Sequence, residues 1–128
     1  MPTRHEFRVP GLNEPISHYT DAVRFGDLLF VSGIGPLAED GSLVGGDDAA
    51  EQTRQIFRNL DRVLRAAGAS PADVLKVTVY LTRSDDFAAM NAVYARRFGE
   101  HRPARSTVIV AALPKGAPLE LDLIARTR

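Results

Sequence analysis

The stretch from Asp48 to Gly68 carries the strongest helical signal in this sequence and limits the folds open to it. Apolar or small side chains recur there three and four positions apart, at Thr53, Ile56, Phe57, Leu60, Val63, Leu64 and Ala67. Asp48 followed by Glu51 resembles an N-terminal capping pair, and Gly68 is suited to end the helix in a left-handed conformation. An amphipathic helix of this kind must cover an apolar layer.

Apolar segments on both sides of this helix predict the strands of that layer. Residues 21–25 and 28–32 flank Gly26-Asp27 and predict a hairpin, whose continuous apolar run at 28–31 predicts burial on both faces. Residues 75–81 alternate, which predicts a strand that buries Leu75, Val77, Val79 and Leu81 on one face. Residues 107–112 and 119–125 predict two more strands, with Glu120 and Asp122 facing away from Leu119, Leu121 and Leu123.

The remaining segments complete a single α+β domain over residues 1–128. A second helix is predicted after Ser84, with Phe87, Met90, Tyr94 and Phe98 on its apolar side and Gly99 at its end. Residues 1–20 contain three prolines and little periodicity, which predicts a surface arm. The order is β-β-α-β-α-β-β, and two helices cover only one face of such a sheet. Because the other face mixes apolar and polar residues, we expect another copy of the chain to close it.

Composition narrows the classes of partner. Sixteen Lys and Arg balance sixteen Asp and Glu among 128 residues, which argues against a dedicated nucleic-acid binder. The chain has no cysteine, so disulfides, thiolate metal sites and a cysteine nucleophile are excluded. His5, His18 and His101 lack ligand spacing, so no metal site is predicted. A polar N-terminus and the lack of a membrane-length apolar run predict a cytoplasmic protein that does not associate with membranes.

Three polar residues on the predicted elements are candidates for a site. Arg105 follows Pro103 at the start of a strand, where its guanidinium is either a solvated end or a fork that grips a carboxylate. Asn91 lies on the apolar side of the second helix, either as a satisfied structural amide or at the border of a site. Glu120 is solvated in a monomer, whereas an oligomer that closes its face would raise its pKa and suit it to proton transfer.

The segment RPARSTVIVAALPKGAPLELDLIA, residues 102–125, resembles the closing signature of the RidA/YjgF family of enamine/imine deaminases. That signature runs PARS, an apolar strand, LPK, a short turn and an alternating E-x-E/D-x-I-A. The resemblance also covers HYTDAVRFGD, FVSGIGP, DDAAEQTRQIFRNLDRVLRAAG and VLKVTVYLTRSDDFAAMNAVY. It therefore extends over nearly the whole chain from Tyr19 onward.

The resemblance implies a chorismate-mutase-like fold and a homotrimer whose sheets pack into a central barrel, with active sites in clefts between subunits. It implies that Arg105 binds the carboxylate of the substrate and that Glu120 positions the hydrolytic water, as the two catalytic residues. It implies further substrate contacts, which would come from Tyr19, Ser32, Gly33, Asn91 and Thr107. We expect no metal and no organic cofactor, because an imine is already electrophilic.

The activity implied is hydrolysis of reactive 2-imino acids and enamines, such as 2-iminopropionate and 2-aminoacrylate, to 2-keto acids and ammonia. Three departures near the expected cleft bear on the substrate: Thr107 replaces a cysteine of many members, the loop before Arg105 is short, and Gly35 follows Ile34 where other members have Gln-Ile. Two alternatives stay open, a pathway-specific deaminase such as 2-aminomuconate deaminase and a non-catalytic protein that binds small carboxylates. A ribonuclease is least favoured, because the sequence shows neither a basic excess nor a basic stripe.

Overall fold

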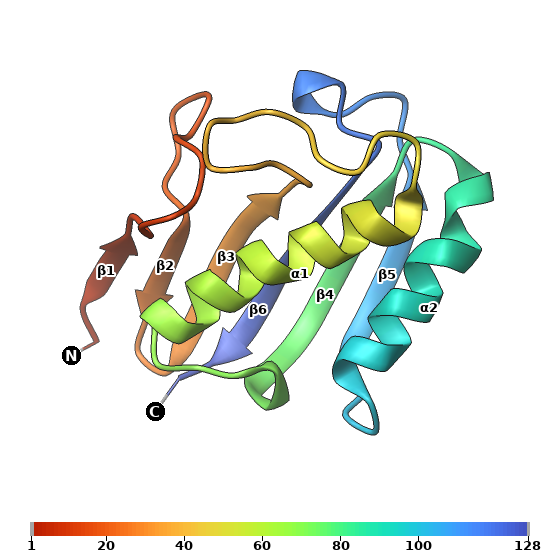
Figure 1. The fold of residues 1–128 in the computed structure, drawn as a ribbon. Coiled ribbons are helices and arrows are strands. Elements are labelled where there is room, and N and C mark those ends of the chain that lie inside the picture. The colour runs from red at the N-terminus through yellow and green to blue at the C-terminus, as the bar shows by residue number, and fades with distance from the viewer. Residues whose placement is uncertain (1, 128) are drawn as a thin grey trace.

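The computed structural model describes residues 2–127, which build one mixed sheet with two helices on one face (Figure 1). The strands within these residues are β1 (Arg4–Phe7), β2 (Ala22–Phe25), β3 (Leu28–Ile34), β4 (Val74–Leu81), β5 (Ala104–Ile109) and β6 (Leu119–Arg126). They lie in the order β1-β2-β3-β6-β4-β5. Only β4 and β5 are parallel among these neighbours, as expected for strands joined through a helix. The predicted α+β class and the one-sided helix layer are confirmed.

The helices are α1 (Ala49–Ala66) and α2 (Phe87–Phe98), and 3-10 turns form at η1 (Pro71–Asp73), η2 (Ser84–Asp86) and η3 (Pro114–Gly116). Helix α1 lies across β3 and β6 and buries Ile56, Leu60 and Val63 in the core. An ion pair between Arg97 and Asp61 joins the two helices. Neither helix of the described chain has the length and apolar character that a bilayer span requires.

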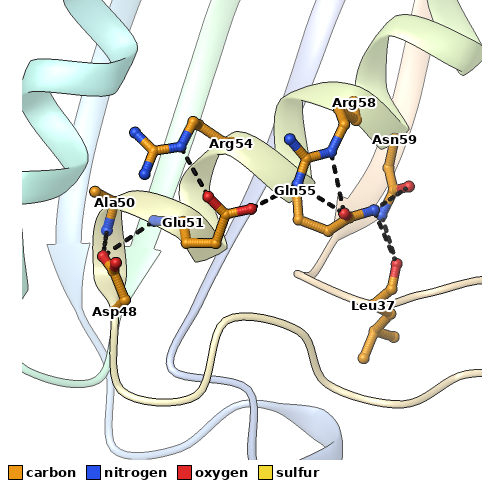
Figure 2. Close-up of polar contacts among 8 residues, drawn as sticks. All are labelled: Leu37, Asp48, Ala50, Glu51, Arg54, Gln55, Arg58 and Asn59. Atoms are coloured by element: carbon orange, nitrogen blue, oxygen red, sulfur yellow. Dashed lines mark hydrogen bonds and ion pairs between the residues drawn. The ribbon is translucent and has the colours of Figure 1, made fainter.

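The ends of α1 explain why this helix was readable from sequence. The carboxylate of Asp48 accepts hydrogen bonds from the backbone N–H groups of Ala50 at 3.0 Å and Glu51 at 3.2 Å (Figure 2). Glu51 does not return the capping bond, because its carboxylate is bound by Arg54 and Arg58. At the other end Gly68 takes the left-handed conformation, with φ +75°.

Two burial predictions for the strands are wrong, and each has a physical cause. Leu75 is 46% exposed while Val74 is fully buried, because the pairing of β4 with β6 shifts between Val74 and Lys76. In β3, Leu29 is buried but Phe30 is 44% exposed, because nothing within the described chain covers the face of the sheet that lacks helices.

The predicted surface arm is more integrated than expected. Its residues 4–7 form β1 at the sheet edge, paired with β2, and its Val9 and Leu12 are buried in the core. Asp21 holds the segment that follows β1, because its carboxylate accepts 2.8 Å hydrogen bonds from the Val9 N–H and from the Arg8 guanidinium. Burial of these apolar side chains is the force that fixes the arm. Strand β5 also begins earlier than expected, so that Arg105 lies inside the strand.

The helix layer is more basic than the neutral total suggests. Helices α1 and α2 carry six arginines and two acidic residues. Glu51 and Asp61 neutralise part of this charge through the ion pairs described above. The balance of charges over the whole chain therefore does not hold for this face of the molecule.

Candidate active site

A pocket of about 350 Å³ opens between the N-terminal arm, the end of β3 and the loop that precedes β6. Its lining contains four of the residues predicted for the site, Tyr19, Ser32, Gly33 and Glu120. Segments that are far apart in the sequence meet here because β3 and β6 are adjacent antiparallel strands.

A β-bulge shapes the floor of this pocket. Val31 pairs with Leu123 and Ile34 pairs with Leu121, so Ser32 and Gly33 together oppose the single residue between those leucines. An extra residue of this kind bends the strand and redirects its side chains. The bulge therefore brings the Gly33 backbone close to β6 at the pocket.

Gly33 is the residue against which the Glu120 carboxyl rests. A Cβ atom built on Gly33 would lie 2.8 Å from the carboxyl carbon of Glu120 and would overlap one of its oxygens. A side chain at position 33 is thus incompatible with the observed place of the carboxyl. The glycine is required here by close approach of another residue, the circumstance in which lack of a Cβ matters most.

Glu120 is half-buried, and burial is the main cause that raises the pKa of its carboxyl. The negative charge of Asp122, two positions along β6, raises this pKa further. Within residues 2–127 no group donates a hydrogen bond to the Glu120 carboxyl that would oppose these effects. A carboxyl that keeps its proton to a higher pH than usual is suited to exchange protons with a bound molecule.

Ser32 and Tyr19 have different roles in this pocket. The Ser32 hydroxyl donates a 2.6 Å hydrogen bond to the Thr20 carbonyl, and its N–H donates to the Asp21 carbonyl at 3.0 Å. Ser32 therefore anchors the arm at the pocket. Tyr19 is 44% exposed at the rim, and its hydroxyl accepts a single long hydrogen bond, 3.5 Å, from the Ile16 N–H. Its own O–H can therefore still donate to a ligand.

The loop after β3 is held against α1 by a buried amide. The side chain of Asn59 donates a 2.9 Å hydrogen bond to the Leu37 carbonyl, and Gln55 donates in turn to Asn59 (Figure 2). Gly35 and Leu37 line the pocket, so α1 contributes to its shape. This contact was not predicted, although a polar residue on the apolar side of a helix was a signal for it.

Arg105 lies in a second group of predicted residues, between β5 and α2. Its guanidinium donates a 2.8 Å hydrogen bond to the Asn91 side-chain oxygen and lies 4.6 Å from the centre of the Tyr94 ring. The Phe87 ring is 5.7 Å from the same guanidinium carbon. These contacts hold the guanidinium in place through a hydrogen bond and cation–π attraction. Asn91 is therefore partnered by Arg105 rather than by a loop.

Two buried hydroxyls close to Arg105 in the fold have no hydrogen-bond partner among the described residues. They belong to Tyr94, whose ring contacts the guanidinium, and Thr107, two positions along β5. Burial raises the pKa of Tyr94, so its hydroxyl stays protonated.

The two groups of predicted residues lie on opposite faces of the sheet. Arg105 pairs with Val77 and Thr107 pairs with Val79, and both valines are fully buried on the side of the helices. Glu120 pairs with Tyr80, which points to the other side. Directly paired residues share a face, so one chain does not bring Arg105 and Glu120 together. A site that contains both residues therefore needs a second chain to supply one of them.

Other contacts in the pocket and on the neighbouring strands were not anticipated. Lys115 lines it from η3 in a left-handed conformation, with φ +63°, which is strained for a residue with a side chain. The Tyr80 hydroxyl donates a 2.8 Å hydrogen bond to Asp122 beside Glu120. The alternation of β6 predicted that Asp122 lies on the same face as Glu120, but only the structure shows that Tyr80 is its hydrogen-bond partner. No three His, Asp or Glu side chains in residues 2–127 gather in a way that would hold a metal ion.

Comparison with known proteins finds relatives that match most of this chain. The family model described as Endoribonuclease L-PSP matches residues 11–127. A RutC family protein of Pyrococcus horikoshii is 47% identical over 113 residues, which are 88% of this chain and 89% of that protein. The chloroplastic Reactive Intermediate Deaminase A of Arabidopsis thaliana is 39% identical over 84% of this chain and 57% of its own length.

A solved structure shares the fold as well. The YjgF gene product of E. coli superposes with a TM-score of 0.88 and is 34% identical, over 97% of this chain and 99% of that one. The match of the family model extends over most of the chain, and the identities to the relatives exceed what fold similarity alone would give. The chain therefore belongs to the YjgF/RidA/RutC family.

Proposed function

We propose that this protein hydrolyses reactive 2-imino acids and their enamine tautomers, such as 2-iminopropionate and 2-aminoacrylate, to 2-keto acids and ammonia. The observation that carries the proposal is the Glu120 carboxyl, which rests on Gly33 inside a pocket with its pKa raised by burial. Membership of a family that includes a protein named Reactive Intermediate Deaminase A supports the same reaction class.

The proposed site is shared between copies of the chain in a homotrimer. Arg105 and Glu120 lie on opposite faces of one sheet, so a ligand that contacts both needs two chains. The face without helices also exposes Phe25, Leu28, Phe30 and Val108, an apolar surface that association would bury. A homotrimer that packs its sheets together accounts for both features.

In the proposed mechanism Arg105 of one chain grips the substrate carboxylate with two parallel hydrogen bonds. This places the imine carbon beside Glu120 of the neighbouring chain. The protonated Glu120 carboxyl gives its proton to the imine nitrogen, and the resulting carboxylate then takes a proton from a water molecule as the water oxygen bonds to carbon. The product of this step is a carbinolamine, and Glu120 is again protonated.

The second half of the reaction uses the same carboxyl. Glu120 protonates the amino nitrogen of the carbinolamine, the carbon–nitrogen bond breaks, and ammonia leaves. The hydroxyl proton returns to the carboxylate as the carbonyl forms, so one water is consumed and one ammonia released. The size of the pocket is at the low end for ligand sites, which favours small substrates.

The test is an imine-loss assay. An amino-acid oxidase generates 2-iminopropionate from alanine, and semicarbazide traps the imine that remains. We expect the wild type to reduce trapping, and Arg105→Ala and Glu120→Gln each to lower the rate by about a hundredfold or more. Glu100→Gln, which makes the same change at an exposed carboxyl, is expected to match the wild type.

Other outcomes would point to the two alternatives. A folded wild type that leaves simple imino acids untouched but deaminates a larger unsaturated amine such as 2-aminomuconate would be a pathway-specific deaminase. A wild type that binds pyruvate through Arg105 but turns over neither class of substrate, with binding unaffected by Glu120→Gln, would be a carboxylate-binding protein. Both results would refute the generalist deaminase.

A further inference from the structure

Beside Glu120 the face of the sheet without helices carries a hydrogen-bonded pair that the reaction above does not use. Tyr80 on β4 lies directly across from Glu120 on β6, but its hydroxyl donates instead to Asp122, at 2.8 Å. Asp122 lies two positions from Glu120, and residues at this spacing share one face of a strand. The tyrosine therefore holds a second carboxylate next to the first.

The pair is built to keep this charge in place. The hydrogen bond to Asp122 and, after it, burial raise the pKa of Tyr80, so the hydroxyl remains a donor at neutral pH. Within the described chain no Lys, Arg or His forms an ion pair with Asp122. Its negative charge is therefore not cancelled before it acts on Glu120.

The other charged or titratable groups around Glu120 are engaged elsewhere or lie at the rim. Lys76, on the same face of β4, is 3.4 Å from the Ser106 hydroxyl on β5, on the side away from β6. Asp21 is compensated by Arg8 and by a backbone N–H. The Lys115 ammonium group donates a 3.3 Å hydrogen bond to the Gly41 carbonyl, and Tyr19 lies exposed at the rim of the pocket. In the proposed trimer Arg105 of a neighbouring chain is engaged by the substrate.

We propose that Asp122, held by Tyr80, is a positioning residue for Glu120: its fixed negative charge favours the protonated carboxyl, the form that donates a proton to the substrate nitrogen. This inference rests on the proposed deaminase function for its catalytic meaning. Its electrostatic content concerns only this chain and can be measured without turnover. Asp122 makes no contact with the reacting atoms in this scheme and acts through Glu120 alone.

The first experiment is a pH–rate profile of imine hydrolysis for Asp122→Asn, Tyr80→Phe and the wild type. Asparagine keeps an acceptor for the Tyr80 hydroxyl but removes the charge. Activity that depends on protonated Glu120 is lost as pH rises, and we expect this loss to occur at a lower pH in Asp122→Asn than in the wild type. The rate at about pH 8 divided by the rate at about pH 6 should be reduced roughly threefold or more. Tyr80→Phe keeps the charge of Asp122 but removes the hydrogen bond that fixes its position, so a smaller displacement of the pH profile in the same direction is expected.

Two controls separate positioning from structural damage. Asp85→Asn removes an exposed carboxylate from η2 and is expected to leave the profile where it was. Asp122→Glu restores a charge on the same face and is expected to recover most of the wild-type profile. If Asp122→Asn and Tyr80→Phe merely lower the rate equally at every pH, the positioning role is wrong.

The second experiment follows the Glu120 carboxyl directly by carbon-13 NMR titration of glutamate-labelled protein, with Glu120→Gln used to assign its resonance. We expect Glu120 to lose its proton at lower pH in Asp122→Asn than in the wild type. An unchanged titration would overturn the inference whatever the enzyme does. A displaced titration in a protein inactive on every imino acid tested would instead reject the deaminase function and leave the electrostatic coupling standing.

Discussion

Glu120 and Gly33 form the most specific contact in the candidate site. The carboxyl occupies the space that any side chain at position 33 would need, and the bulge in β3 creates that space. The motif around position 33 was recognisable in the sequence, but the contact was not. Which carboxyl approaches this glycine depends on the pairing of β3 with β6, and that pairing is not encoded locally.

Gly33→Ala is predicted to displace the Glu120 carboxyl while leaving the fold intact, because the colliding atoms are at the free end of a side chain. We expect imine hydrolysis to fall by about ten- to a hundredfold, in line with the effect of small misplacements in active sites. Gly35→Ala is the matched control, since its nearest neighbours would be 3.8 Å away. Wild-type activity of Gly33→Ala, measured beside the melting temperatures of both variants, would contradict the predicted role of Gly33.

Glu120 is also predicted to cost stability at neutral pH. Its pKa in the folded chain is raised above the ordinary value of 4.5, so the folded state holds this proton more tightly than the unfolded state. Stability therefore falls as pH rises from the unfolded pKa through the folded one. We expect Glu120→Gln to melt at a higher temperature than the wild type at about pH 8, with a smaller difference at about pH 4.

Thermal denaturation of both proteins at the two pH values measures this difference. A stabilisation by Glu120→Gln that is the same at both pH values would mean that the glutamine packs better rather than that it removes a charge. A lower melting temperature of Glu120→Gln than of the wild type at the higher pH would contradict a raised pKa of Glu120.

At the scale of elements, α1 shows how far local chemistry alone determines structure. Its start at Asp48, its apolar spacing and its end before Gly68 were all predicted and are confirmed. Its Asn59, by contrast, acts over a long sequence separation by holding the loop at Leu37. Helix ends and apolar spacing can be predicted from residues close in the sequence, whereas a long-range contact such as that of Asn59 cannot.

Asp48→Ala is predicted to destabilise the protein by about 1 kcal/mol, because two backbone N–H groups at the start of α1 lose their acceptor. Asp47→Ala is a control of the same charge one position earlier, where the side chain makes no cap bond. Urea unfolding of both variants gives the difference. Equal midpoints would show that water replaces the cap without cost.

Strand limits were less predictable than helix limits, for a physical reason. Because of the register shift in β4, Val74 is buried in place of Leu75. Strand β5 begins at Ala104 because it pairs with β4 from Lys76 onward. A strand is delimited by the partner that accepts its hydrogen bonds, and that partner is remote in sequence. The same reason explains why β1 was missed, since only pairing with β2 makes residues 4–7 a strand.

At the scale of the whole molecule, the sheet separates Arg105 from Glu120. This separation motivates the proposal of a shared site, since no movement of side chains brings groups on two faces of one sheet together. The neutral total charge was a poorer guide, because the helix layer is rich in arginine. The prediction that nucleic acid is not a partner therefore needs its own measurement, an RNA-binding titration at low and high salt.

A shared site predicts complementation between inactive variants. Arg105→Ala and Glu120→Ala, co-expressed with different tags and purified as mixed trimers, are expected to regain about one third of the wild-type sites, since only one of the three sites in a mixed trimer joins an intact Arg105 to an intact Glu120. Purified homo-oligomers of each variant, mixed without subunit exchange, are the control. If the mixed oligomers are no more active than either variant alone, the site does not lie between chains.

The sequence by itself determined the α+β class, both helices, the two ends of α1, the end of α2 before Gly99, the alternation that places Glu120 on the face opposite to Leu119 and Leu121, and the resemblance to the family. These features depend on spacing, caps and turns within a few residues. The tertiary structure decided that the arm enters the core, that Gly33 receives the Glu120 carboxyl, that Tyr80 binds Asp122 and that Arg105 lies on the far face. Each of these depends on which strands become neighbours and in what register, which only the folded chain as a whole specifies.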